Sequence, residues 1–119
     1  MLYTAKVSFF DENKGKMKPY YVIANHGNDV VVPDQSDLEQ WRNGNLTWEG
    51  LKVSYLAKLM TQNAGEWMER VSTQAVSEDI VLVSDEEGQK HLYRVLLAEI
   101  MINMFGGHLN LRYAGELKG

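Results

Sequence analysis

The sequence has no cysteine and only 2 prolines among its 119 residues. Without cysteine, neither a disulfide framework nor a thiolate metal site can form. A chain without disulfides suits a reducing compartment, so we expect a cytoplasmic protein. The first residues, Met1 to Val7, lack the basic and then apolar pattern of a secretory signal, which agrees with this expectation.

Long apolar runs and an excess of positive charge are also missing. A helix that spans a bilayer needs about 20 consecutive apolar residues, whereas the longest apolar stretch, 95–105, is interrupted by Glu99 and Asn103. We therefore expect no membrane contact. The net charge of −4 has the wrong sign for a general nucleic-acid binder, and it is too small for a mimic of DNA.

Motifs for catalysis or cofactor binding are absent from the sequence. No serine lies in a G-x-S-x-G setting, and no glycine pattern of a phosphate-binding loop occurs. We expect no cofactor and favour a non-enzymatic protein. The enzymatic alternative is a small metal-dependent hydrolase that uses a turn containing His26, Asp29 and Asp34, although this spacing matches no recognised metal site and such residues are common in turns.

Apolar residues are plentiful, at 45% of the chain. That supply is enough for a hydrophobic core, and the length fits a single globular domain over residues 1–119.

Alternating and β-branched patterns predict strands at both ends of the chain. Residues 2–10, 20–24 and 30–32 are separated by polar turns and predict a three-stranded meander. Residues 80–83 and 91–95 flank an acidic turn and predict a second hairpin. For 96–113 we favour two further strands around Gly106-Gly107, because apolar residues would then share one face. A helix that ends at a glycine is the alternative for 96–105.

The middle of the chain has helical periodicity. A capping box at Ser36 predicts a short helix that ends near Asn43-Gly44, and Thr47 predicts the start of a longer one. A third helix is expected to begin at the capping box of Asn63, unless Gly65 lies inside one long helix. The predicted fold class is α+β: an antiparallel sheet of about six strands in two hairpin-rich halves, with two or three helices inserted between them and packed on one face.

Tryptophan gives the strongest indication of function. Trp48 and Trp67 lie on apolar helix stripes, whereas Trp41 has polar neighbours and shares its face only with Leu38. An exposed tryptophan is a typical anchor of a protein interface. We therefore predict a protein-binding module that regulates or inhibits a macromolecular partner, such as an accessory protein of a phage or mobile element. Its predicted binding residues are Leu38, Trp41, Arg42, Phe105 and His108.

The apolar run 100–105 supports a second, structural hypothesis. Its low charge and high β-propensity would make an exposed strand prone to aggregation. Such a strand would lie at the centre of a sheet or be covered by a second copy of the chain. The alternative is therefore a homo-oligomeric structural or particle subunit joined through the 96–113 strands.

Overall fold

The computed structural model describes residues 1–6, 8–9, 20–22, 29–86 and 91–117. These residues form a four-stranded sheet of β1 (Leu2–Lys6), β2 (Tyr20–Val22), β3 (Ile80–Ser84) and β4 (Tyr113–Glu116). The strand order is β2-β3-β1-β4, and each neighbouring pair is parallel. The prediction of mixed helices and strands is confirmed, but the prediction of an antiparallel, six-stranded sheet is wrong.

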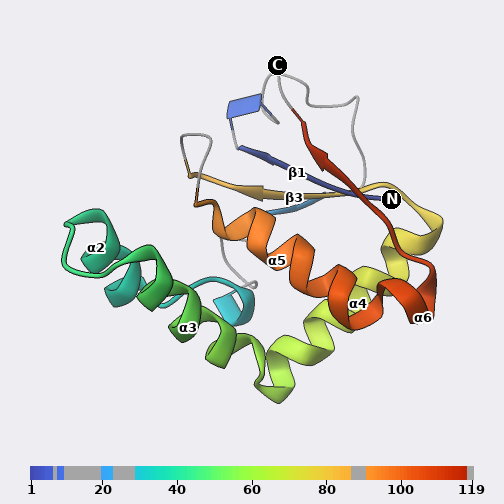
Figure 1. Cartoon of the computed structure of the whole chain (residues 1–119). Coiled ribbons are helices and arrows are strands. Elements are labelled where there is room, and N and C mark those ends of the chain that lie inside the picture. Colours follow the sequence, from blue (N-terminus) through green and yellow to red (C-terminus); the bar gives the residue numbers. More distant parts are fainter. Residues whose placement is uncertain (7, 10–19, 23–28, 87–90, 118–119) are drawn as a thin grey trace.

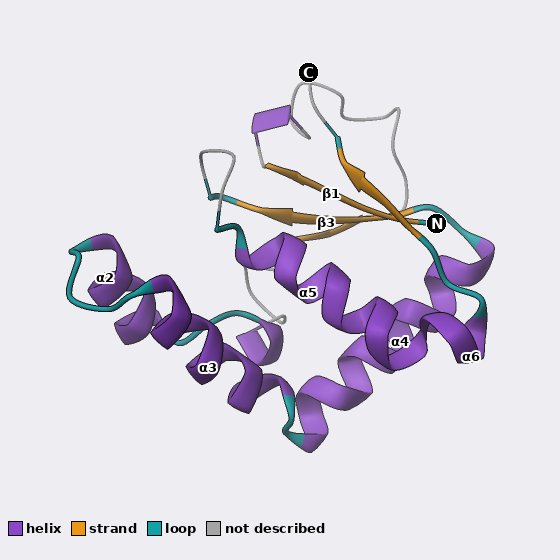
Figure 2. Ribbon diagram, in the orientation of Figure 1, coloured by secondary structure: helices purple, strands orange, loops and turns teal. Residues whose placement is uncertain are grey.

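The helices between the strands explain why the sheet is parallel. Parallel strands need long crossover connections, and helices commonly provide them. After β2 the chain forms a short 3-10 helix (Asp29–Val31), then α2 (Gln35–Arg42), α3 (Trp48–Leu59) and α4 (Gln62–Ser77). Between β3 and β4 it forms α5 (Tyr93–Met101), a π-helix (Ile102–Gly106) and α6 (Gly107–Leu109). Figures 1 and 2 show the labelled helices on one side of the sheet.

The strand β3 contained a signal for parallel pairing that the hairpin prediction did not use. All five residues of β3 are buried. A continuous apolar segment such as Ile80 to Val83 is typical of a strand that is covered on both faces, as parallel strands usually are. An antiparallel strand with one solvated face would have alternated instead.

Three predicted strands are helical. Residues 30–32 enter a 3-10 helix, and the segments 91–95 and 96–105 belong mainly to α5 and the π-helix. The buried apolar residues of α5 recur at helical spacing and face the larger core: Tyr93, Leu97, Ala98, Ile100 and Met101. The strands at 96–113 through which a homo-oligomer was predicted are therefore absent; only the last of those residues, Tyr113, begins a strand, β4.

The predicted helical middle is confirmed, with shifted starts. Helix α2 begins after Asp34 rather than at Ser36, and α4 begins after Thr61 rather than at Asn63. Thr47 caps α3 as predicted, since its side-chain oxygen accepts the Gly50 N–H at 3.0 Å. α3 and α4 are separate helices, so the predicted break is confirmed.

The core has two parts, one on each face of the sheet. The larger part lies between the sheet and helices α2 to α5, and Leu2, Tyr55, Met68 and Leu97 are among its buried side chains. The smaller part contains Ala5, Val81 and Val83. In the described part of the chain, no helix is long and apolar enough to cross a membrane.

Candidate functional site

The predicted binding residues of α2 differ in exposure. Leu38 is 5% exposed and packs in the larger core. Trp41 is half-buried against the same core, and Arg42 is exposed in the last turn of the helix.

The other two predicted binding residues follow α5. Phe105 is half-buried in the π-helix and packs against the core, whereas His108 is exposed on α6. Figure 1 shows α2 and α6 at opposite ends of the molecule. The five residues therefore form two separate groups, and whether either group binds a partner stays a prediction.

The predicted metal turn lies largely outside the described residues. His26 and the side chain of Asp29 are not described. The Asp34 carboxylate is 2.9 Å from the Lys58 ammonium, so it contributes to a salt bridge between the start of α2 and α3. Among the residues that the structure describes, no group of three or more His, Asp or Glu side chains could hold a metal ion.

Three aromatic rings meet where α2, α3 and the start of α5 come together. The Trp41 ring centroid lies 5.7 Å from that of Trp48 and 5.9 Å from that of His91. The Trp48 and His91 centroids are 4.9 Å apart. Tilted and edge-on contacts at these distances are favourable for aromatic rings. Trp41 thus supports the two other rings, and this aromatic cluster joins three segments of the chain.

A pocket of about 240 Å³ opens beside the cluster, between α3 and α5. We call it the aromatic pocket; its lining residues are Trp48, Lys52, His91, Leu92, Val95, Leu96 and Glu99. Sites for drug-sized ligands usually have volumes of about 300–1,000 Å³. The aromatic pocket is smaller than that range, so its size suits a single side chain better than a cofactor.

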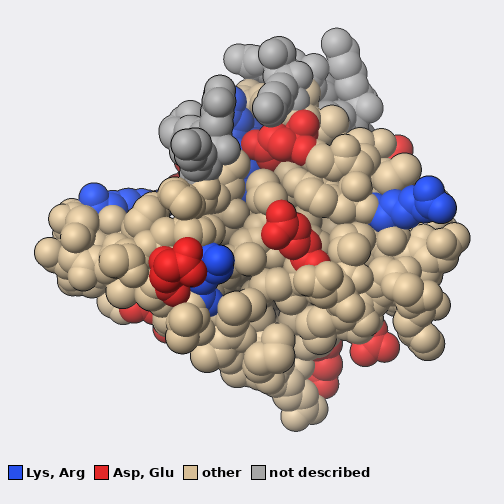
Figure 3. All heavy atoms as spheres, in the orientation of Figure 1, with Lys and Arg blue, Asp and Glu red and all other residues tan. Residues whose placement is uncertain are grey.

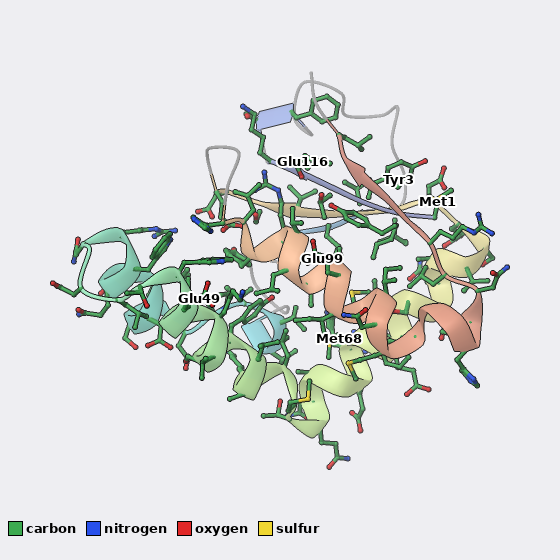
Figure 4. The ribbon with its side chains drawn as sticks, viewed as in Figure 1. Met1, Tyr3, Glu49, Met68, Glu99 and Glu116 are labelled. Carbon is green, nitrogen blue, oxygen red and sulfur yellow. The ribbon has the colours of Figure 1, made fainter. Side chains whose placement is uncertain are left out.

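The lining of the aromatic pocket also includes two charged groups, Lys52 and Glu99. The Lys52 ammonium is 3.5 Å from the carboxylate of Glu49 on the same helix. Glu99 is exposed on α5, and among the described residues it has no ion pair. Figure 4 labels Glu49 on α3 and Glu99 on α5, and Figure 3 shows acidic groups over both helices, with a basic group beside the one over α3. Of the charged side chains that the structure describes at this pocket, the Glu99 carboxylate is thus one that forms no ion pair.

His91 has an unusual backbone conformation at the edge of the pocket. Its φ angle is +58°, in the left-handed region, where residues other than glycine are uncommon. Such a conformation costs on the order of 1–3 kcal/mol and persists only where the surroundings favour it. Here it accompanies the contact of the His91 ring with Trp41 and Trp48.

A second polar cluster lies at the carboxyl ends of β3 and β4. Arg94 is fully buried, and its Nε and Nη2 donate to the two carboxylate oxygens of Glu116 at 3.1 and 2.5 Å. Its Nη1 donates to Ser84 Oγ at 2.9 Å and to the Glu86 carbonyl at 3.0 Å. All three guanidinium nitrogens are therefore hydrogen-bonded. We call Ser84, Glu86, Arg94 and Glu116 the arginine network.

The Glu86 side chain connects this network to the start of α5. Its carboxylate accepts the backbone N–H groups of Tyr93 at 2.8 Å and Arg94 at 3.3 Å, and the Ser84 hydroxyl at 2.9 Å. Burial raises the pKa of Glu86, and these hydrogen bonds oppose that effect. Ligands of parallel sheets commonly bind at the carboxyl ends of the strands. Among the residues described there, Ser84, Glu86, Arg94 and Glu116 hydrogen-bond to one another instead.

Two buried tyrosines link α3 and α5 below the pocket. The ring centroids of Tyr55 and Tyr93 are 6.0 Å apart, and the Tyr55 hydroxyl donates to the Val31 carbonyl at 2.5 Å. Burial is the largest cause that raises the pKa of both phenols. The next cause is Tyr93 for Tyr55, and the negative charge of Glu86 for Tyr93. Both hydroxyls therefore stay protonated near neutral pH, and neither can act as a base there.

The sequence analysis missed the aromatic pocket because it assigned 91–95 to a strand. Val95 and Glu99 lie four residues apart on one face of α5, and Trp48 and Lys52 do so on α3, whereas His91 precedes α5. These two stripes line the pocket. Their spacing was visible in the sequence, but only a helical assignment of α5 makes it meaningful.

Comparisons with protein-family models, curated proteins and solved structures found no match to this chain.

Proposed function

We propose that this chain is a small protein-binding module that holds one apolar side chain of a macromolecular partner in the aromatic pocket. The observation that carries the proposal is the pocket itself, in which Trp48, His91 and an aliphatic wall surround a space of about 240 Å³. Interface hot spots are typically buried anchors in such pockets, and tryptophan is enriched among them. The module would act in the cytoplasm and regulate or inhibit its partner through binding.

The positions of the polar groups favour binding over catalysis at this pocket. His91 and Glu99 line the same pocket, but they are eight residues apart along α5 and its start. At 1.5 Å per residue, the six steps from Tyr93, where α5 begins, to Glu99 alone span about 9 Å, and His91 precedes Tyr93. A histidine base and an orienting carboxylate must lie within hydrogen-bonding distance of each other, so these two residues do not form such a pair.

That the chain is a homo-oligomeric structural subunit stays a prediction, but the strands through which it would assemble are not present among the described residues. The predicted strands at 96–113 are replaced mainly by α5, the π-helix and α6. The aromatic pocket, in contrast, is present in the fold and supports the binding proposal.

Val95→Arg tests the proposal by filling the pocket from within. Val95 lines the pocket and is half-buried, and arginine has a better helix propensity than valine, so the variant should fold. Wild type and V95R would be immobilised and exposed to lysate of the source organism, and bound proteins quantified by mass spectrometry. We expect V95R to retain the specific partner at least about ten-fold less, which corresponds to about 1.4 kcal/mol.

Met104→Arg is the matched control. Met104 is 43% exposed in the π-helix and does not line the pocket, and the substitution introduces the same charge. It should leave partner retention unchanged. A partner that V95R retains and M104R loses would contradict the proposal and would favour the surface near Phe105 and His108.

A further inference from the structure

We infer that the partner segment carries a lysine or arginine next to its apolar anchor, and that Glu99 and the Trp48 ring bind this cation. The inference rests on the proposed function, since it concerns the same aromatic pocket. It adds the charge of the partner and the spacing of the two recognised side chains.

The charge of the rim gives the first argument. Lys52 already has Glu49 as a partner at 3.5 Å, whereas the exposed Glu99 has no ion pair among the described residues. An acidic partner residue would have to compete with Glu49 for Lys52 and would be repelled by Glu99. A basic residue would pair with Glu99 without breaking an existing contact.

The aromatic wall gives the second argument. Trp48 is half-buried and lines the pocket together with Glu99. The face of an indole ring attracts a cation within about 6 Å of its centre, and tryptophan is the most effective of the aromatic residues. A lysine or arginine also has an apolar stem, which can cover Leu96 and Val95 while its charged end reaches the rim.

The length of the pocket along α5 predicts how many residues separate the apolar anchor from the basic residue in the partner. Val95 and Glu99 are one helical turn apart, which corresponds to about 6 Å along the axis. In an extended segment, residues two positions apart are separated by about 6.6 Å. In a helical segment, residues four positions apart have the same separation as Val95 and Glu99. The anchor and the cation should therefore be two residues apart in a strand-like partner, or three to four in a helical one.

The test is selection from a displayed library of random 12-residue peptides on the full chain. Peptides that bind wild type and not Val95→Arg identify ligands of the pocket. We expect these peptides to be enriched in lysine or arginine at two to four residues from a leucine, isoleucine, methionine, phenylalanine or tryptophan. Selection on Glu99→Lys should remove this enrichment and favour aspartate or glutamate at the same distance from the anchor.

The strongest selected peptide would then be synthesised and its Kd measured against Glu99→Gln, with Glu69→Gln as the control. Both glutamates are exposed on helices, but Glu69 lies on α4 and does not line the pocket. We expect E99Q to raise the Kd about five-fold or more, since a charged contact at the interface is lost, and E69Q to leave it unchanged. Higher salt should reduce the difference between wild type and E99Q.

The outcomes separate the two proposals. Pocket-dependent peptides without basic enrichment, or with an unchanged Kd for E99Q, would overturn the inference of a cation and leave the proposed function intact. A selection that yields no peptide sensitive to V95R would overturn both. Basic peptides whose preference reverses in E99K would support both.

Discussion

His91 and Arg94 are only three residues apart, yet they belong to regions of opposite character. Arg94 is fully buried, and its hydrogen-bonding groups are used within the arginine network. His91 is exposed and borders the aromatic pocket, where Glu99 has no ion pair among the described residues. The first region satisfies its own polar groups, and the second offers apolar and charged surface to a partner. We therefore expect changes in the arginine network to reduce stability, and changes in the aromatic pocket to reduce binding.

The comparison predicts its largest effect for Arg94→Ala. Removal of the guanidinium leaves the Glu116 carboxylate, which is 19% exposed, without its bidentate partner. Breaking one side of a buried ion pair typically costs about 3–5 kcal/mol. We expect a loss of that size in the free energy of unfolding, measured by urea denaturation. Arg94→Lys, which keeps the charge but not the bidentate geometry, should lie between wild type and R94A.

If R94A lowers the free energy of unfolding by less than about 1 kcal/mol, the contrast between the two regions is wrong, because single exposed ion pairs already contribute up to that much. The arginine network would then resemble the exposed rim of the pocket in its effect on stability.

The second prediction concerns Tyr55→Phe. This change removes the hydroxyl that donates to the Val31 carbonyl and leaves that buried carbonyl without its partner. An unsatisfied buried acceptor costs about 1–3 kcal/mol. Urea denaturation should show a loss in this range, with partner binding unchanged once the protein is folded. An unchanged unfolding free energy would show that this hydrogen bond does not stabilise the link between α3 and the 3-10 helix.

The third prediction is the pH dependence caused by Glu86. Burial raises the pKa of this carboxyl above 4.5, so the folded protein binds its proton more tightly than the unfolded chain does. The stability that this adds is present below the ordinary pKa and is lost as the pH rises through the raised pKa. The unfolding free energy of wild type, relative to Glu86→Gln, should therefore fall as the pH rises above the ordinary glutamate pKa of about 4.3. If the difference in unfolding free energy between wild type and E86Q stays constant as the pH rises, or grows in favour of wild type, the raised pKa of Glu86 is contradicted.

The smallest effect on stability is expected in the aromatic pocket. Glu99 is exposed and has no ion pair among the described residues, so Glu99→Gln should change the free energy of unfolding by less than about 0.5 kcal/mol. The same variant should weaken binding of a basic peptide. If E99Q destabilises the protein as much as Y55F does, the aromatic pocket contributes to the stability of the fold. The distinction between a stabilising arginine network and a pocket for binding is then wrong.

The sequence predicted the local structure better than the tertiary arrangement. The starts and ends of helices depend on nearby residues, and Thr47 and Gly44 were sufficient to place the boundary between α2 and α3. The parallel pairing of β1 with β3 joins residues almost 80 positions apart. No local pattern contains that information, although the fully apolar β3 was consistent with it.

The candidate site was predicted only in part, for the same reason. Trp41 was selected because of its polar neighbours, and it does belong to the aromatic cluster. The pocket, however, depends on α3 and α5 lying side by side, and residues 91–95 were assigned to a strand. Glu86 was similarly assigned to an exposed turn, whereas its carboxylate caps α5 seven residues later in the chain.

The most direct test of the central claim is chemical-shift mapping by NMR of the isotope-labelled full chain with a basic peptide selected on it. The proposal predicts that the largest changes occur at the Trp48 indole N–H and at the amides of His91, Val95 and Glu99, with the Arg94 guanidinium signals unchanged. Changes centred on Phe105 and His108, or on Arg94 and Glu116, would contradict it.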